Sequence, residues 1–579
     1  MYRFAIFAVA GIIMSMAFDV QPRAQTIEPA LEQAVAASDP ATLLPVIVSL
    51  TPPPTSLKTL VQPTMTKEQR RVRVLTELRN RAAIDLPPLI SQMKKLGAVH
   101  IKRLWMIASV AADVPAGSVN AIANLSGVDN VRLDSTMKAP KPQSAIAAAP
   151  EWNIAAIRAP DLWALGFRGQ GVVVASLDTG VDVDHPDLAP RWRGGTNSWF
   201  DPYGATTSPY DLNGHGTQVM GLMVGGDAGG TSVGVAPAAK WIGAKIFDDN
   251  DLAVLSNVHL AFQWLLDPDG NALTADAPNV VNASFEFPTP NDCDTEFEPD
   301  IIVLKTAGIA VVAAAGNLGP MAASSASPGN YPATFAVGAV DAGNTVGEFS
   351  SRGPSACDGT IFPEVSAPGV AVETTDRSFG GMLFYANVTG TSAAAPHAAG
   401  AMALLLSASP NLKPEEMEIG LEQSALDIGP VGPDNDTGYG LIDVLEAFHQ
   451  LGGSAPADVD GDTYVAGVDC NDNDASIYPG AIEIKLDGID QDCNGYDLTI
   501  QITRAEYRPS RDRLTVVATS RLGKKAKLVL VGYGPMKWSQ ARRVWFREVP
   551  KVRSDPGMVT VSGIEGTEVA NTVIIGSGS

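Results

Sequence analysis

Between residues 172 and 340 the sequence repeats one pattern, a short run of almost purely apolar residues, with segments of helical length between several of the runs. The runs are VVVASL (172–177), WIGAKIF (241–247), NVVNASF (279–285), GIAVVAAAG (308–316) and TFAVGAV (334–340). A strand with so few polar residues must be buried on both faces, which happens in parallel sheets covered by helices. The pattern therefore predicts an α/β fold built on a doubly wound, mostly parallel sheet.

Segments of different texture precede and follow this pattern, and 579 residues are too many for a single hydrophobic core. Residues 43–136 suggest the order β-α-β-β-α-β of a small split-βαβ domain. The Ala-, Pro- and Ser-rich stretch 135–153 is expected to be an exposed linker. Short alternating runs near the C-terminus predict a small antiparallel β-sandwich. The expected plan is a leader at 1–25, an α+β domain at 43–136, an α/β domain at 150–452, an Asp-rich tract at 457–497 and an all-β domain at 498–579.

The first 25 residues have the layout of a secretory signal. One Arg is followed by an apolar run from Phe4 to Met14 and then by small residues near Ala17, where cleavage is expected. The apolar run is short for a bilayer span, and an uncleaved anchor is the alternative. We therefore expect a secreted chain, extracellular or periplasmic, with no stable membrane span.

Four cysteines in an exported chain predict two disulfides. Cys470 and Cys493 share a tract with too few apolar residues for a core of its own, where a crosslink or a metal is usually needed. Of the three possible pairings we expect Cys470–Cys493 with Cys293–Cys357.

The net charge of −22 is unevenly spread along the chain. Residues 1–150 carry +6, residues 151–452 carry −26, residues 453–497 carry −10 and residues 498–579 carry +8. An acidic middle argues against nucleic acid as the main partner. It favours attraction between parts of the chain, or binding of cationic ligands, with simple solubility as an equal alternative.

Three residues suggest nucleophilic catalysis. Asp178 ends the first apolar run, His215 lies between two glycines in NGHGTQVMG, and Ser392 opens the apolar stretch SAAAPHAAGAMALLL. Each alone has a structural explanation, as a helix cap or a turn. Together they supply a serine nucleophile, a histidine base and a carboxylate to orient the base, in one of the known chain orders of this triad.

The blocks LDTGVDVDHPDL, NGHGTQVMG and GTSAAAPHAAGAMALLL closely resemble the three catalytic blocks of the subtilisin-like serine proteases, or subtilases, over roughly 150–450. VVAAAGNLGP resembles the block that supplies their oxyanion asparagine, here Asn317. The resemblance implies a subtilisin-like fold, an inhibitory propeptide at the N-terminus and polypeptide substrates. His185 and His397 are expected to have structural roles.

One departure from the family concerns substrate binding. The resemblance implies that the segment Ser284-Phe285-Glu286 pairs with extended substrate, but the family usually has Gly where Glu286 stands. A side chain there would narrow a subsite or attract basic residues, so substrate preference is left open.

The Asp-rich tract predicts bound Ca²⁺ in a structural role, with no cofactor for catalysis. Two twelve-residue loops place oxygen ligands at alternate positions and a carboxylate at the twelfth, which suits calcium. A weaker third loop contains Asp490 and Asp492, and the tract also resembles a metal-binding repeat of bacterial surface proteins. A solvated acidic linker is the alternative. The predicted ligands are Asp458, Asp460, Asp462, Tyr464 and Asp469 in the first loop and Asp472, Asp474, Ser476, Tyr478 and Glu483 in the second.

The sequence thus predicts a secreted serine endopeptidase made as a zymogen, with its own propeptide as intramolecular inhibitor. The alternative is a pseudo-protease that serves as a scaffold for binding a surface or a partner. The complete set Asp178, His215, Ser392 and Asn317 favours the enzyme, because a pseudo-protease usually lacks one member.

Overall fold

The computed structural model describes residues 26–51, 57–140, 152–230, 232–378, 384–454, 460, 462, 469–478, 481–552 and 554–575. The chain forms two compact units. One contains Met1–Ile157 and Gly169–Asp443, the other Arg158–Arg168 and Val444–Ser579. Within the described ranges no helix has the length and apolar character needed to cross a membrane. The predicted leader at 1–25 lies outside the described residues.

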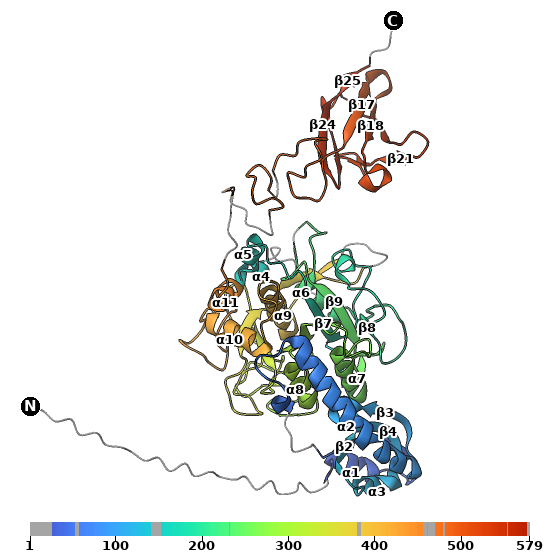
Figure 1. The fold of residues 1–579 in the computed structure, drawn as a ribbon, viewed down its shortest axis with the longest axis vertical. Coiled ribbons are helices and arrows are strands. Elements are labelled where there is room, and N and C mark those ends of the chain that lie inside the picture. The colour runs from blue at the N-terminus through green and yellow to red at the C-terminus, as the bar shows by residue number, and fades with distance from the viewer. Residues whose placement is uncertain are drawn as a thin grey trace, which may run out of the picture. The chain divides into compact units, whose positions relative to one another are not determined.

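A seven-stranded sheet forms the centre of the first unit (Figure 1). Its order is β14-β13-β12-β11-β7-β9-β8, and all neighbours are parallel. The predicted fold class is therefore confirmed. The strands are β7 (Val173–Asp178), β8 (Trp199–Phe200), β9 (Lys240–Lys245), β11 (Val280–Ala283), β12 (Ala310–Ala314), β13 (Phe335–Val340) and β14 (Val365–Pro368).

Helices pack on this sheet in two pairs. Helix α6 (His215–Val224) packs against α9 (Thr391–Ala408), while α7 (Leu255–Leu266) packs against α8 (Glu298–Thr306). Nearly every residue of α9 is buried, as its all-round apolar sequence predicts. Gly400 allows this close packing, because a Cβ there would lie 2.6 Å from Cβ of Val235. The remaining elements here are α4 (Trp152–Ala156), β15 (Val372–Thr375), β16 (Tyr385–Val388) and α10 (Pro414–Ser424).

The sheet reverses its winding beside β7. Strand β7 lies between β9 and β11, so connections run in opposite directions from this point. In open α/β sheets the carboxyl ends of the strands form a crevice at such a reversal. Asp178 is the last residue of β7, and Ser284 follows β11 directly.

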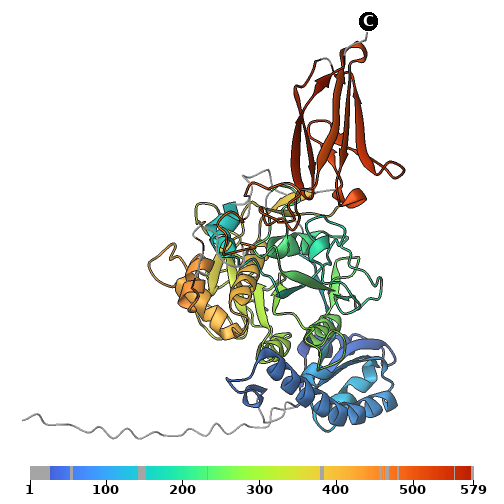
Figure 2. The same cartoon turned by 45° about the horizontal axis from the view of Figure 1, so that its top comes forward.

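An N-terminal region, defined as residues 26–140, adds a five-stranded sheet of order β1-β5-β2-β4-β3. The elements from β2 to β5 follow in the expected order, and β1 and α1 precede them without having been predicted. Figures 1 and 2 both show this region beside α7 and α8. The elements are β1 (Thr26–Ile27), α1 (Pro29–Ala36), β2 (Leu43–Leu50), α2 (Lys67–Lys95), β3 (Val99–Leu104), β4 (Ser109–Pro115), α3 (Val119–Ala123) and β5 (Val128–Leu133).

The expectation of an exposed linker at 135–153 is wrong at both ends. Strand β6 (Thr136–Lys138) pairs antiparallel with β10 (Leu252–Val254), and Met137 is only 5% exposed. At the other end, Asn153 in α4 is buried against His397. Low periodicity hid these contacts, because pairing with an edge strand needs backbone groups and no particular sequence.

Buried ion pairs join the N-terminal region to the α/β core. Arg71 in α2 lies 2.8 Å from Asp267 and 2.9 Å from Asp276, with its side chain 3% exposed. Arg132 in β5 makes a two-bonded contact with Glu296, at 2.7 and 2.8 Å. Ion pairs therefore connect the basic N-terminal part of the chain to its acidic middle part.

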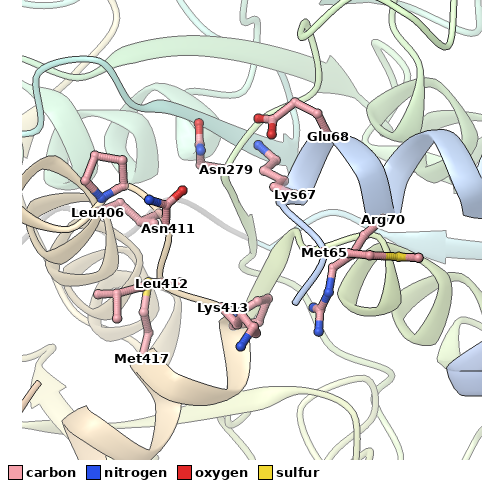
Figure 3. A pocket seen from close by; sticks show the side chains of 13 residues that line it. Met65, Lys67, Glu68, Arg70, Asn279, Leu406, Asn411, Leu412, Lys413 and Met417 are labelled. Carbon is pink, nitrogen blue, oxygen red and sulfur yellow. The ribbon is translucent and has the colours of Figure 1, made fainter. Parts of the chain in front are cut away.

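A pocket lies where the start of α2 meets the segment before α10. Figure 3 shows Lys67, Arg70 and Lys413 among the residues that line it. Lys67 donates to the Pro278 carbonyl at 2.7 Å, and burial lowers the pKa of its ammonium to about 7.

His259 in α7 also lies at the contact between the N-terminal region and the α/β core. Its two ring nitrogens lie 2.8 Å from Asp300 and 2.8 Å from Glu296, the carboxylate that also binds Arg132. Burial alone would lower the pKa of His259, but the two carboxylates outweigh it and raise the pKa to about 9. The imidazole is therefore held as a cation at neutral pH.

The second unit contains a small β-sandwich, as predicted. A five-stranded sheet, β21-β22-β18-β17-β25, and a four-stranded sheet, β20-β19-β23-β24, share one apolar core. It is not purely antiparallel, because β25 pairs parallel with β17. The elements are β17 (Gln501–Arg508), β18 (Arg513–Thr519), β19 (Val529–Leu530), β20 (Gly534–Pro535), β21 (Lys537–Ser539), β22 (Val544–Pro550), β23 (Met558–Gly563), β24 (Gly566–Asn571) and β25 (Val573–Ile574), with α5 (Ala159–Ala164) and α11 (Val444–Gln450) in the same unit.

Both predicted disulfides are present, Cys293–Cys357 and Cys470–Cys493. The second crosslinks a tract whose described residues contribute few apolar side chains to a core.

We predict that Arg71→Ala strongly destabilises the N-terminal region, since it leaves the buried Asp276 without its cation and Asp267 with Arg79 alone. Breaking a buried pair in this way costs about 3–5 kcal/mol. Urea unfolding of the full chain carrying Ser392→Ala, which prevents the self-cleavage implied by the family resemblance, measures the loss. Arg73→Ala on the exposed side of α2 is the control. Equal effects of the two changes would contradict this account of the ion pairs.

We also predict that His259 stabilises the fold in a pH-dependent manner. Its pKa is raised from an ordinary 6.5 to about 9, so the stabilisation is complete below pH 6.5 and disappears as the pH rises through about 9. The difference in unfolding free energy between the Ser392→Ala chain and its His259→Gln variant should shrink over that range. A difference independent of pH would mean that His259 folds as the neutral ring.

Candidate active site

Asp178 and His215 form a buried pair at the crevice. Asp178 Oδ1 lies 2.8 Å from Nδ1 of His215, the first residue of α6, and also accepts the Thr179 backbone N–H at 2.7 Å. Both side chains are buried. The carboxylate thus fixes the orientation of the ring and the nitrogen that carries its proton.

The two glycines beside His215 are needed for this pair. Gly214 precedes α6 with φ +109°, in the left-handed region that favours glycine. A Cβ on Gly216 would collide with the Gly180 carbonyl oxygen and lie 3.1 Å from Cβ of Asp178. The small residues therefore let the helix start touch the end of β7.

Nε2 of His215 is available for proton transfer. It is buried and has no hydrogen-bond partner within the described part of the chain. Burial lowers the pKa of His215, but the Asp178 carboxylate outweighs that effect and the net pKa is raised. The ring therefore becomes a stronger base. The small pocket beside it is lined by His215, Gln218, Val219, Leu222, Val388, Thr389, Ser392 and Ala393.

Ser392 is the second residue of α9, where backbone N–H groups have no partner inside the helix. Its carbonyl oxygen accepts a hydrogen bond from Ser284 Oγ at 3.0 Å, and Asn282 donates to Ser284 at 2.8 Å. The end of β11 thereby holds the start of α9. Ser284 belongs to the predicted substrate-binding segment, and its side chain supports Ser392.

The amide of Asn317 lies beside the same helix start. Its Oδ1 accepts from the Thr391 backbone N–H at 2.9 Å and from Thr391 Oγ1 at 3.2 Å. Because the oxygen is bound, the NH₂ group is the donor end of this exposed side chain, and it also donates to the Glu286 carboxylate. Donors at this place suit an oxyanion on a carbonyl attacked by Ser392.

The other two residues of the predicted substrate segment differ in exposure. Phe285 is buried in the core against Phe247 and Phe297, so only its backbone is left for a substrate. Glu286 is half-buried, and its Oε2 accepts the Asn317 backbone N–H at 2.6 Å. Sequence reasoning missed this contact, since no pattern reports a hydrogen bond between two strand ends.

His185 and His397 are both held in hydrogen bonds inside the fold. His185 contacts the Phe384 carbonyl at 2.9 Å, and His397 contacts the Ala393 carbonyl and Asn153 at 2.8 Å each. Burial lowers the pKa of His397 to about 4, so it stays neutral.

The acidic tract brings carboxylates together in a different grouping from the two predicted loops. Asp460, Asp469 and Asp472 form one group, which joins the two loops, and Glu483 groups with Asp490 and Asp492. Asp469 is 7% exposed, and its Oδ2 has no hydrogen-bond donor among the described residues. Asp474 instead accepts from Ser476 Oγ at 2.7 Å. Asp458 and Tyr464 lie outside the described residues.

A buried histidine–carboxylate pair and a serine at a helix start, set at the crevice of a parallel sheet, define a serine hydrolase of the α/β class. Comparisons of the sequence with known protein families agree with this class. Residues 169–440 match the model of the Subtilase family, and residues 469–497 match that of a metal-binding motif. The chain belongs to the subtilase family of serine endopeptidases.

Three individual relatives are each 34% identical over the matched residues. Bacillopeptidase F of Bacillus subtilis (strain 168) is 34% identical over 422 residues, which are 66% of this chain and 29% of that protein. Subtilisin E of the same strain is 34% identical over 49% of this chain and 68% of its own length. Subtilisin of Bacillus pumilus is 34% identical over 52% of this chain and 99% of its own length.

Proposed function

We propose that this subtilase is secreted as a zymogen and cleaves polypeptides through Ser392, His215 and Asp178, with Asn317 in the oxyanion hole. The observation that carries the proposal is the buried hydrogen bond of 2.8 Å between His215 Nδ1 and Asp178. It leaves Nε2 in a pocket that Ser392 also lines.

The reaction is acyl transfer. Ser392 Oγ attacks a peptide carbonyl carbon while His215 Nε2 takes the hydroxyl proton, which it then gives to the leaving amine. Water, activated by the same nitrogen, hydrolyses the acyl-enzyme. Asp178 stabilises the imidazolium that forms in both steps. The Asn317 amide and the Ser392 backbone N–H bind the oxyanion, and losing such an amide in subtilisin itself costs about 10²–10³-fold in kcat.

In this proposal the N-terminal region is the inhibitory propeptide. Strand β6 pairs with β10, and the Ala139 N–H donates to the Asp251 carbonyl at 2.8 Å. Asp251 in turn contacts Asn213, two residues before His215, at 3.0 Å. These contacts link the end of the N-terminal region to the segment that leads into His215, and self-cleavage within 135–153 would separate the two parts.

The C-terminal tract is proposed to bind calcium. Asp460, Asp469 and Asp472 offer clustered oxygen ligands, and the buried Asp469 Oδ2 lacks a donor among the described residues. Hard oxygen ligands in flexible geometry suit Ca²⁺. The ion would neutralise and stiffen the tract, and no step of catalysis involves it. Two disulfides fit the oxidising compartment that secretion implies.

We predict that a fluorophosphonate probe labels the processed protein and fails to label its Ser392→Ala variant. Asp178→Asn should still be folded but lower kcat about 10⁴-fold, because the ring loses its fixed tautomer. Circular dichroism of both variants is the control for folding. Labelling that survives Ser392→Ala, or no labelling of any form, would favour the scaffold alternative.

We predict that the full chain carrying Ser392→Ala binds Ca²⁺ in calorimetry and that Asp469→Asn weakens binding about tenfold or more, since it removes a charged ligand. Asp39→Asn, at an exposed residue of the N-terminal region, should leave binding unchanged. No heat at millimolar calcium would reduce the tract to a solvated acidic linker.

A further inference from the structure

Glu286 reaches from the end of β11 to the chain that follows β12. Its Oε2 accepts the Asn317 backbone N–H at 2.6 Å. A Cβ built on Gly316 would lie 2.7 Å from the same oxygen and 2.8 Å from Cβ of Ala326. The carboxylate therefore lies against the backbone of Gly316 and Asn317, close to Ala326.

This position is next to the bond to be cleaved. The Asn317 amide is proposed to bind the oxygen of the carbonyl that Ser392 attacks. The side chain attached one atom from that carbonyl belongs to the residue just before the cleaved bond. A carboxylate bound to the backbone of Asn317 therefore lies where that substrate side chain must pass.

The charge of Glu286 is poorly compensated. Partial burial raises the pKa of its carboxyl group, while hydrogen bonds from the Asn317 backbone and side chain oppose the rise. Within the described ranges Glu286 forms no ion pair with a basic side chain, and its hydrogen-bond donors are uncharged. A half-buried carboxylate in such surroundings gains most from a cation that a ligand supplies.

Large apolar, small and basic substrate side chains would each affect the hydrogen bond between Glu286 and the Asn317 N–H differently. A large apolar side chain would displace the carboxylate from the Asn317 N–H and leave it unpaired. A small side chain would leave it in place and gain nothing from it. A lysine or arginine side chain would replace the hydrogen bond with a charge-assisted one.

We propose that Glu286 makes this enzyme prefer lysine or arginine immediately before the cleaved bond. The inference rests on the proposed function of Ser392 and Asn317. Of the two effects expected of a side chain at Glu286, narrowing a subsite or attracting basic residues, it selects the second. The net charge of −26 on residues 151–452 acts in the same direction, because it draws cationic substrates toward the core.

The test compares p-nitroanilides of succinyl-Ala-Ala-Pro-X, with X as Lys, Phe or Ala, on the processed full-length enzyme. We expect kcat/KM to be highest for Lys. Glu286→Gln, which keeps the shape and removes the charge, should lower the ratio of kcat/KM for Lys to kcat/KM for Ala about 30-fold or more, and this ratio cancels any effect that the change has on Asn317 itself. Glu415→Gln, at an exposed residue of α10, is the control with the same change in net charge.

Two outcomes would overturn the inference. A preference for Ala that Glu286→Gln does not change would mean that the carboxylate only narrows the subsite. A preference for Phe would mean that it moves aside without cost. In both cases cleavage and fluorophosphonate labelling persist, so the proposed catalytic function stands. Absence of both would overturn that function instead.

Discussion

Burial of the central sheet on both faces is the constraint from which the rest of the structure follows. Strands such as β12 and β13 have no polar side chains to present to water, so helices must cover them. Only the ends of the strands are then left for chemistry. Asp178, Glu286 and Asn317 all follow or end such strands, and the helix starts at His215 and Ser392 reach the same edge. The site is thus a consequence of the layer arrangement.

At the same edge of the sheet, both backbone packing and side-chain hydrogen bonds position the groups that are proposed to react. Gly216 lets α6 touch β7, and the Ser284 hydroxyl holds the carbonyl of Ser392. Neither group takes part in the reaction as proposed. Each fixes a reacting side chain through a rigid element, which is what precise catalytic geometry requires.

Charge organises the contact between the N-terminal region and the core. Arg71 and Arg132 are cations from the basic N-terminal part of the chain, and their partners Asp267, Asp276 and Glu296 belong to the acidic middle. Buried pairs of this kind contribute little net stability but are costly to break one partner at a time.

The sequence by itself determined the layers and indicated the groups that are proposed to react. Periodicity predicted the parallel sheet, the buried α9 and the β-sandwich, because burial imposes a repeating pattern that is legible in the chain. Residue types and chain order pointed to Asp178, His215 and Ser392, the resemblance to subtilase blocks added Asn317, and the cysteine context indicated both disulfides. Such features depend on local chemistry or on a repeated environment.

Tertiary structure alone decided which separate segments meet. The pairing of β6 with β10, the support of Ser392 by Ser284 and the contact of Glu286 with Asn317 join residues far apart in the chain. The grouping of Asp472 with Asp460 and Asp469 likewise cut across the predicted loops. A single hydrogen bond or ligand cluster leaves no periodic trace in a sequence, since it depends on where the backbone brings two atoms within about 3 Å of each other.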